Sequence, residues 1–302
     1  MGKSTYQFDR WKPRAKSSWA WRVFKKHNIE FQRMYTTFDT GRKYTYQNLG
    51  KNGAQKNDVP DKHFKFDRPW ESKNFSDLED WISAFNDLEN WMNLNALVAI
   101  LSNLETYIAT IVPLALESDI GTLYGVPHRI DGIEILKHGK DKPFNFNDIV
   151  TSCTKGTWDS RISAYERAFG RAPKYLKNHV SELDLMRNLR NNVAHAFGRG
   201  IEAARVSGNI KTIPIEKLSR DRLLKYQTVV WKVTKSIDAH LHNFHIGEYQ
   251  AILFYHNLYP SLNHNVHQNM RAVELKKKIG QFGIESQGKE FCKGLVAYYE
   301  SI

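Results

Sequence analysis

The chain has 302 residues, a formal net charge of +12 and two cysteines, which is enough length for one large domain or two small ones with a self-sufficient core. Because Cys153 and Cys292 lie far apart and no CxxC pair is present, the sequence argues against a zinc site or a disulfide framework and favours a reducing, cytoplasmic setting. No signal peptide or membrane span is expected, since polar residues interrupt the long apolar stretches.

Residues 1–75 carry most of the charge. They hold 17 Lys and Arg against 7 Asp and Glu, so +10 of the net +12 lies in this quarter of the chain. Such asymmetry predicts a polyanionic partner, and nucleic acid is the natural one. Glycines and prolines in its second half predict a basic, aromatic and loop-rich extension, in which Lys43–Tyr46 could form a short strand.

The basic residues of this extension are interspersed with aromatic ones, a pairing that binds single-stranded nucleic acid through its phosphates and bases. The candidate RNA-binding residues here are Lys12, Arg14, Lys16, Trp19, Trp21 and Arg22. The same rings would equally serve to pack the extension against the main domain. The sequence leaves both interpretations open.

A long amphipathic helix is predicted after the extension. Ser76–Glu79 has the pattern of a capping box, and apolar residues then recur at helical spacing to about Leu116. The pattern allows one long helix, or two helices with a break near Asn93–Asn95, and Pro113 should kink or loosen the last turn. Glu105 lies within this otherwise apolar stripe.

Further helices are predicted along the rest of the chain. They are expected at about Ser160–Phe169, from near Lys177–Ser181 to Phe197, from Ser219 to Phe244, at Asn269–Ile279 and at Gln287–Ser301. Residues 121–156 are expected to form a long connection with a helical turn at Asn147–Cys153. The predicted fold is therefore an all-α bundle over residues 76–246. The extension of residues 1–75 precedes it, and a small helical appendage of residues 247–302 follows.

No metal or cofactor site is expected. The sequence contains no Gly-rich phosphate loop, no GxSxG elbow and no carboxylate cluster for paired metals. His240, His242 and His245 cluster at the end of one predicted helix, but no carboxylate or thiol is suitably spaced to complete a metal site. We interpret them as surface or core-edge histidines.

The stretch Leu183–Arg199 is the most informative part of the sequence. Its apolar residues recur at intervals of three and four, which predicts a helix with one buried stripe, made of Leu185, Met186, Leu189, Val193 and Phe197. Gly198 and Gly200 should end the helix. Arginine, asparagine and histidine side chains lie beside the stripe.

These polar side chains suit phosphodiester chemistry. A histidine can move a proton between oxygens near neutral pH, and an arginine matches phosphate oxygens as negative charge builds up on them. Asn191 and His195 share one helical face. Arg190 lies about 140° around an ideal helix from His195, and Arg187 is better aligned, so geometry leaves the choice of arginine open. Arg187 and Arg199 are further candidate RNA contacts.

The segment RNNVAH, Arg190–His195, resembles the signature of the HEPN superfamily, in which an arginine and a polar residue precede a histidine within one helix. The resemblance implies a small all-α bundle and a metal-independent endoribonuclease that works as a homodimer, with the two signature helices facing each other across one cleft. It implies that Arg190 and His195 are catalytic and that Asn191 is their polar companion. Glu105 resembles an acidic residue that some HEPN branches carry on the preceding helix, where it orients the arginine or histidine; the alternative is a surface glutamate.

Ribonucleases of this kind are frequently toxins or antiviral abortive-infection effectors that cut transfer RNA or other host or viral RNA. The resemblance thus implies an RNA substrate, no cofactor, and an inhibitory or activating protein partner. Other classes stay open, namely a non-catalytic RNA-binding or assembly module and a helical DNA-binding regulator that uses the C-terminal hairpin. For His195 itself, the alternative is a solvated position near a helix C-terminus.

Overall fold

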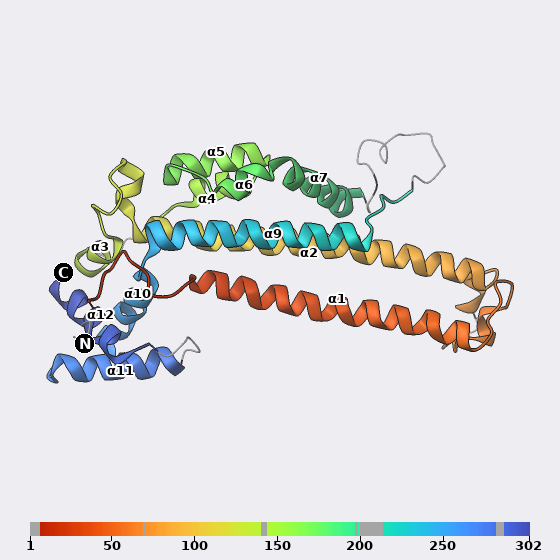
Figure 1. Ribbon diagram of the computed structural model, residues 1–302, viewed down its shortest axis with the longest axis horizontal. Coiled ribbons are helices and arrows are strands. Elements are labelled where there is room, and N and C mark those ends of the chain that lie inside the picture. Colours follow the sequence, from red (N-terminus) through yellow and green to blue (C-terminus); the bar gives the residue numbers. More distant parts are fainter. Residues whose placement is uncertain (1–6, 69, 140–143, 197–198, 200–213, 282–286) are drawn as a thin grey trace, which may run out of the picture. The chain divides into compact units, whose positions relative to one another are not determined.

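The computed structural model describes residues 7–302 except 69, 140–143, 197–198, 200–213 and 282–286. Within these residues the protein is all-α, as the sequence predicts, and no β-strand is assigned (Figure 1). The chain divides into two compact units: unit 1 comprises residues 1–23, 106–178 and 233–302, and unit 2 comprises residues 24–105 and 179–232. The predicted end of the signature helix at Phe197, Gly198 and Gly200 lies outside the described residues.

Unit 2 is built from segments of four helices. These are α1 (Trp19–Lys51), α2 (Leu78–Ser118), α7 (Val180–Ala196) and α9 (Arg220–Leu241), of which α1, α2 and α9 also have residues in unit 1. Short 3-10 turns at Pro60–Lys62 and Ser72–Asn74 lie between α1 and α2. The core of unit 2 is formed mainly by aliphatic side chains of α2, α7 and α9.

The prediction of a loop-rich extension is wrong for Trp19–Lys51, which forms a single helix of 33 residues with no strand at its Tyr44–Tyr46 portion. Its buried side chains include Phe24, Tyr35 and Leu49, which fall on one helical stripe. A glycine inside a helix costs only about 1 kcal/mol relative to alanine. Packing of the aromatic stripe therefore overrides the two glycines within the helix.

Helix α2 is continuous over 41 residues, so of the two alternatives that the sequence allows, one long helix is confirmed and a break near Asn93–Asn95 is excluded. Asn93 is buried, and its amide links two other parts of unit 2. Its Oδ1 accepts a hydrogen bond from the Tyr35 hydroxyl at 2.7 Å, and its Nδ2 donates to the Leu218 carbonyl at 2.9 Å. A polar residue that suggests a break from sequence thus stays helical because both ends of its amide are hydrogen-bonded.

The start of α2 differs by one residue from the predicted capping box. Asp77 Oδ1 accepts the backbone N–H of Asp80 at 2.9 Å, and the Asp80 carboxylate accepts the N–H of Ser76 at 3.1 Å. Asp77 is therefore the N-cap, and Asp80 reaches back to the N–H of the residue before it, so the reciprocal pair of a regular capping box is shifted by one residue on that side.

Helix α2 is also the one helix among the described residues that is long and apolar enough to cross a membrane by length and composition. The protein itself buries 44% of its most apolar window. Leu94, Leu97 and Leu104, for example, have no exposed surface. Much of the apolar character of α2 is thus accounted for by its place in the core.

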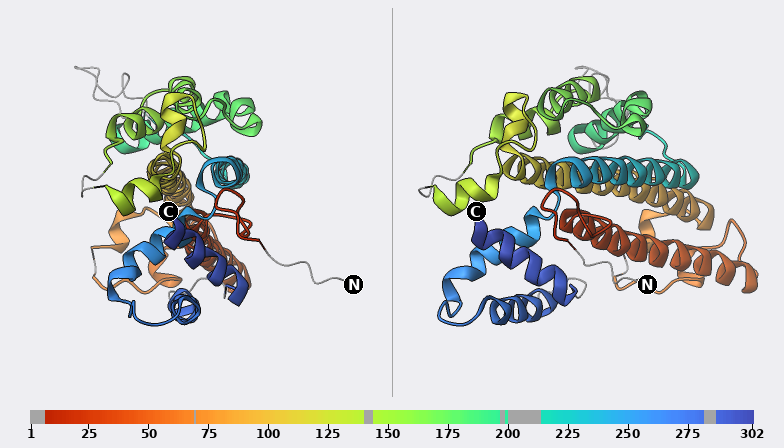
Figure 2. Two further views of the ribbon diagram at one scale, coloured as in Figure 1. Left: turned by 90° about the vertical axis from the view of Figure 1, so that its left-hand side faces the viewer. Right: turned by 60° about the vertical axis from the view of Figure 1, so that its left-hand side comes forward.

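Unit 1 contains the remaining helices. They are α3 (Gly132–His138), α4 (Asn147–Thr154), α5 (Trp158–Phe169), α6 (Lys174–Asn178), α10 (Tyr249–Leu258), α11 (Gln268–Gln281) and α12 (Lys289–Ser301). Helices α11 and α12 pack side by side as a helical hairpin (Figure 2), with Leu275, Ile279, Phe291 and Leu295 fully buried. A π-helical turn at His242–Ile246 follows α9, and 3-10 turns lie at Ile120–Tyr124 and Tyr259–Ser261.

The described N-terminal residues of unit 1 are anchored by a buried arginine. Arg10 is paired with Asp131, with 3.0 Å between Nε and Oδ2, and donates to the Ile246 carbonyl at 2.7 Å. Gly247 lies against this segment with φ at +52°, and a Cβ there would meet the Arg10 carbonyl oxygen at 2.3 Å. A glycine is required at 247 for both reasons.

Candidate functional site

The predicted catalytic arginine lies on α7 and is held by a carboxylate from α2 within unit 2. Arg190 Nη2 donates to Glu105 Oε2 at 3.1 Å, and Arg190 Nη1 donates to Asn191 Oδ1 at 3.1 Å. The side chains of Arg190 and Glu105 remain 29% and 25% exposed. Three of the four predicted catalytic residues, Arg190, Asn191 and Glu105, are thus brought together at a place that solvent reaches.

The local sequence explains why Glu105 reaches this position. Its neighbour Leu104 is fully buried, and Leu101 one turn earlier is also in the core. Glu105 lies one residue further around α2 and therefore leaves the core at the edge of the stripe. From there its carboxylate meets the Arg190 guanidinium, a contact that the orienting role expected from the resemblance requires.

His195 is not bonded to this cluster. It occupies the last turn of α7 and is exposed. Among the described residues, no hydrogen bond or ion pair joins its ring to Arg190, Asn191 or Glu105. The angular separation between positions 190 and 195 on a helix accounts for this, and one chain by itself does not place the imidazole on the guanidinium.

Arg187, the alternative arginine, has a different kind of partner. Its Nε donates to Asp184 Oδ1 at 2.8 Å, a pair between residues one turn apart on the same helix. Arg190 is instead fixed by a second helix. The two arginines are therefore distinguished by the helix that orients them, a difference that sequence spacing does not reveal.

The buried stripe of α7 is shifted from the prediction. Leu185 is 56% exposed, whereas Leu183 has no exposed surface and Met186 and Leu189 are buried as expected. Leu183, Met186 and Leu189 follow the i, i+3, i+6 spacing of one face. Apolar residues at 183, 185 and 186 allow either of two neighbouring faces of the helix to be buried. The structure buries the face that contains Leu183.

The predicted RNA-binding residues of the N-terminal segment, all in unit 1, differ in exposure. Lys12, Arg14 and Lys16 are exposed, Trp19 and Arg22 are half-buried, and Trp21 is buried. Trp21 is therefore a packing residue, and its predicted role in stacking on a base is wrong because the core of the protein covers the ring. Arg199 is half-buried.

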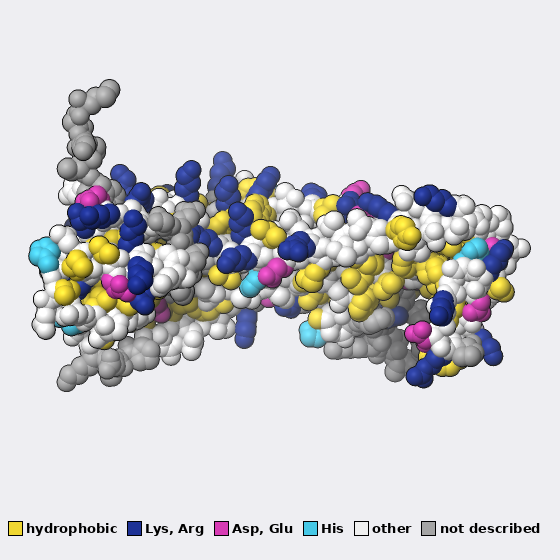
Figure 3. Space-filling view, turned by 90° about the horizontal axis from the view of Figure 1, so that it is seen from below, with side chains coloured by type: hydrophobic (Ala, Val, Ile, Leu, Met, Phe, Trp, Pro, Cys, Tyr) yellow, Lys and Arg dark blue, Asp and Glu magenta, His cyan; other side chains and the backbone are white. Residues whose placement is uncertain are grey.

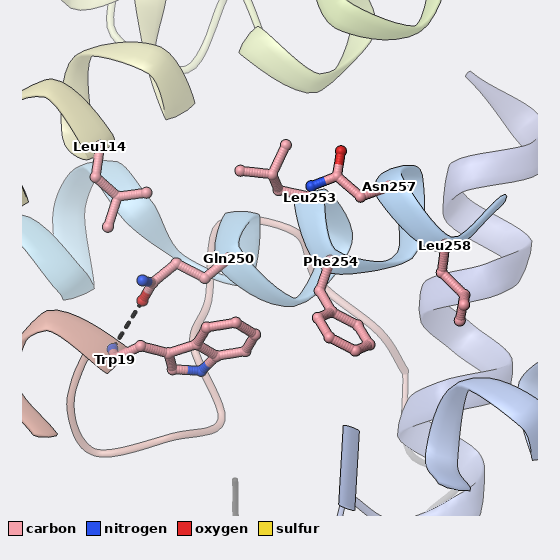
Figure 4. Close-up of a pocket in the computed structure, with 7 residues that line it drawn as sticks. All are labelled: Trp19, Leu114, Gln250, Leu253, Phe254, Asn257 and Leu258. Carbon is pink, nitrogen blue, oxygen red and sulfur yellow. Dashed lines mark hydrogen bonds between the residues drawn. The ribbon is translucent and has the colours of Figure 1, made fainter. Parts of the chain in front are cut away.

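Trp19 contributes to a groove of about 480 Å³ in unit 1 (Figure 4). Its backbone N–H donates to Gln250 Oε1 at 2.9 Å, and its ring meets Phe254 edge to face at 6.2 Å. The other lining residues are mostly apolar: Leu114, Leu253, Asn257 and Leu258. This groove is distinct from the cluster around Arg190, whose residues do not line it.

The three histidines at the end of α9 and in the π-helical turn after it are buried, so of the two interpretations, surface or core-edge, the surface one is wrong. His245 Nδ1 lies 2.9 Å from Asp119 Oδ2, His242 Nε2 lies 2.9 Å from the Ala15 carbonyl oxygen, and His240 Nδ1 lies 2.7 Å from the Tyr165 hydroxyl. Burial, together with His245 and Arg171, lowers the pKa of His240 to about 4. Their partners are distant in sequence, and for that reason spacing within the helix gave no signal for them.

Unit 1 contains a second buried polar group, centred on Asp238, that the sequence did not indicate. Asp238 accepts hydrogen bonds from the Ser18 hydroxyl and, at 3.1 Å, from the Tyr107 hydroxyl. Burial raises the pKa of Asp238 and of Tyr107. Across the part of the chain that the structure describes, no group of three or more His, Cys, Asp or Glu side chains is arranged to hold a metal ion.

Comparisons with known proteins add no relative. No family model matches the chain, and neither a curated protein nor a solved structure matches it.

Proposed function

We propose that this protein is a metal-independent endoribonuclease of the HEPN type, cytoplasmic, and active as a homodimer through α7. The observation that carries the proposal is the pairing of Arg190 with Glu105 beside Asn191, one turn before the exposed His195 on the same helix. An arginine with a fixed orientation and a solvent-accessible histidine are the two groups that the RNNVAH resemblance requires.

In the proposed reaction the ribose 2′-oxygen attacks the adjacent phosphorus, and the bond to the 5′-oxygen breaks. The proton of the 2′-hydroxyl leaves to a base, the 5′-oxygen gains a proton, and the products are a 2′,3′-cyclic phosphate and a 5′-hydroxyl. His195 carries the proton, while Arg190 stabilises the charge that grows on the phosphoryl oxygens. Glu105 is a positioning residue that keeps the guanidinium in one orientation.

The dimer follows from chemistry as well as from resemblance. Two oxygens exchange protons in the reaction, and each chain supplies one histidine in the signature. Because His195 and Arg190 are not in contact within one chain, we expect the facing α7 of a second copy to complete the site.

The charge of the N-terminal segment supports RNA as the substrate. Lys12, Arg14 and Lys16 are exposed, and the residues between them are half-buried, so the three cations project from an anchored backbone. Among the described side chains visible in Figure 3, Lys and Arg are also more frequent than Asp and Glu. We expect a toxin or abortive-infection effector acting on transfer RNA or another RNA, restrained or activated by a protein partner.

The test is incubation of wild type, His195→Ala and Arg190→Ala with total transfer RNA in the presence of a chelator. Fragments from wild type alone, ending in a 2′,3′-cyclic phosphate, are the expected result. A confirmed dimer that leaves RNA intact in every lane, across several salt concentrations, would contradict the proposal and favour the non-catalytic RNA-binding module. Preference for duplex DNA would instead favour the DNA-binding regulator.

A further inference from the structure

A second groove, of about 390 Å³, lies between α1 and α9 within unit 2. Its lining comes from one stripe on each helix: Lys25, Asn28, Ile29 and Gln32 on α1, and Gln227, Thr228 and Trp231 on α9. The spacing on α1 is i, i+3, i+4, i+7, which is one continuous face. None of these residues belongs to the cluster around Arg190.

Two amides in this groove occupy positions where the core would favour apolar side chains. Asn28 follows Phe24 by one turn on the stripe that buries α1, and Gln227 follows Leu223 by one turn on α9. Both amide residues are only 8% exposed. Burial of a polar amide is unfavourable unless its hydrogen bonds are made, so this pair needs an explanation.

The two amides satisfy each other only in part. Gln227 Nε2 donates to Asn28 Oδ1 at 3.2 Å. Among the described residues, Gln227 Oε1 and Asn28 Nδ2 make no further hydrogen bond, and both side chains line the groove. The groove therefore presents one acceptor and one donor side by side, and exchanging O and N in both amides leaves the same pair in the opposite order.

The remaining lining residues restrict the class of ligand. Trp231 is half-buried, lines the groove and is backed by Phe24 with 6.1 Å between ring centroids. Lys25 is exposed at the rim. An adjacent donor and acceptor match the edge of a nucleobase, an indole suits its flat face, and a lysine suits the phosphate attached to it.

We propose that the groove between α1 and α9 binds one unpaired nucleobase of a single-stranded RNA, with the adjacent phosphate on Lys25. The proposal rests on the proposed function only in taking RNA as the polymer that carries the base. The groove would bind a base outside the cluster around Arg190 and so add affinity for unpaired segments. The donor and acceptor pair fits the class of nucleobases and does not select one of them.

The test measures binding separately from cleavage. His195→Ala serves as the background, and fluorescence anisotropy gives the Kd for short single-stranded oligoribonucleotides, for an abasic oligomer of equal charge, and for mononucleotides. Trp231→Leu should weaken oligoribonucleotide binding by about tenfold, the size of one lost stacked base, and Gln227→Met should weaken it by about threefold to tenfold, the size of one lost hydrogen bond. Binding of the abasic oligomer should change little.

Lys25 has a matched control in its neighbour Lys26, which is also exposed but does not line the groove. Lys25→Gln should weaken binding several-fold and lower its salt dependence by about one ion, whereas Lys26→Gln should have a clearly smaller effect. Thermal melting identifies any variant that fails to fold. Both lysines lie at the surface, so their substitution should not affect folding. The two lysine variants therefore still test the groove if the buried substitutions unfold the protein.

The outcomes separate this proposal from the proposed function. RNA cleavage by wild type with unchanged binding by every groove variant would overturn the groove and leave the nuclease. Groove-dependent binding without cleavage would overturn the nuclease and support the groove. Equal affinity for the abasic oligomer would show that no base is bound, and groove-dependent binding of mononucleotides alone would assign the groove to free nucleotides and overturn the RNA substrate.

Discussion

Several histidine and aspartate side chains of unit 1 are sealed in the core, whereas the arginine and glutamate that define the candidate site in unit 2 keep contact with solvent. Asp119 and His245 in unit 1 have side chains that are 0% and 7% exposed. Arg190 and Glu105 in unit 2 are 29% and 25% exposed. Charged and titratable side chains thus stabilise the core of unit 1, whereas in unit 2 they stay accessible to a substrate.

The comparison teaches that residue type alone does not identify a reactive site in this protein. Unit 1 contains more hydrogen-bonded histidines than the signature helix, yet His240, His242 and His245 among them are buried and paired with groups from their own core. The following predictions test whether the buried charged side chains contribute to stability and the exposed ones to RNA cleavage.

The largest effect is expected at His195. His195→Ala should reduce RNA cleavage by about 10²–10⁴-fold, because general acid–base catalysis contributes about that much, and the melting temperature should be unchanged because the side chain is exposed. Cleavage rates and melting curves of both proteins check this. A variant with full activity would show that the exposed histidine is not the proton carrier.

Arg10→Met should mainly affect stability. Removing one partner of a buried ion pair costs about 3–5 kcal/mol, because Asp131 would stay buried without its cation. Chemical denaturation gives the free energy of unfolding, and Lys12→Met, at an exposed position of the same segment, is the control. If both variants lose equally little stability, the buried pair does not hold unit 1 together.

His240 should make stability depend on pH. Its pKa is about 4 in the folded protein and near 6.5 when unfolded, so the unfolded chain binds the proton more readily. The free energy of unfolding should be fully present above pH 6.5 and fall by up to roughly 3 kcal/mol as the pH drops to about 4. In His240→Asn the free energy of unfolding should decline less steeply over this pH window, as measured by denaturation at several pH values. An equal decline in both proteins would show that His240 is not the group responsible.

The smallest effect is expected from the residues that orient the two arginines. Glu105→Gln should lower cleavage about tenfold by loosening Arg190, an effect typical of outer positioning groups. The matched variant Asp184→Asn should leave cleavage nearly unchanged, because Asp184 holds Arg187. The reverse pattern would make Arg187 the catalytic arginine.

Much of the architecture could be predicted from the sequence. Apolar periodicity indicated α2, α5, α7, α9, α11 and α12, because each buries a stripe whose spacing is local information. The failures have local causes too. Asn93 and the glycines of α1 resemble helix breaks, and only distant partners such as Tyr35 and Leu218 show why the helices continue.

The candidate site was predicted in part. The spacing within Arg190–His195 is a property of one helix and needed no tertiary information. The meeting of Arg190 with Glu105 joins residues 85 positions apart and was expected from resemblance alone. The groove between α1 and α9 was not expected, because its amide pair depends on the register between two helices that lie far apart in the sequence.

The anchored N-terminal segment has a consequence for proteolysis. Lys12, Arg14 and Lys16 offer side chains that trypsin recognises, but the backbone around them is hydrogen-bonded. The Arg10 carbonyl accepts the Glu248 N–H at 2.9 Å, and the Ala15 carbonyl oxygen lies 2.9 Å from His242 Nε2. A protease must pull several residues into an extended strand before it cuts, so digestion here requires local unfolding of unit 1. The rate of tryptic cleavage in this segment therefore reports directly on how often that part of the fold opens.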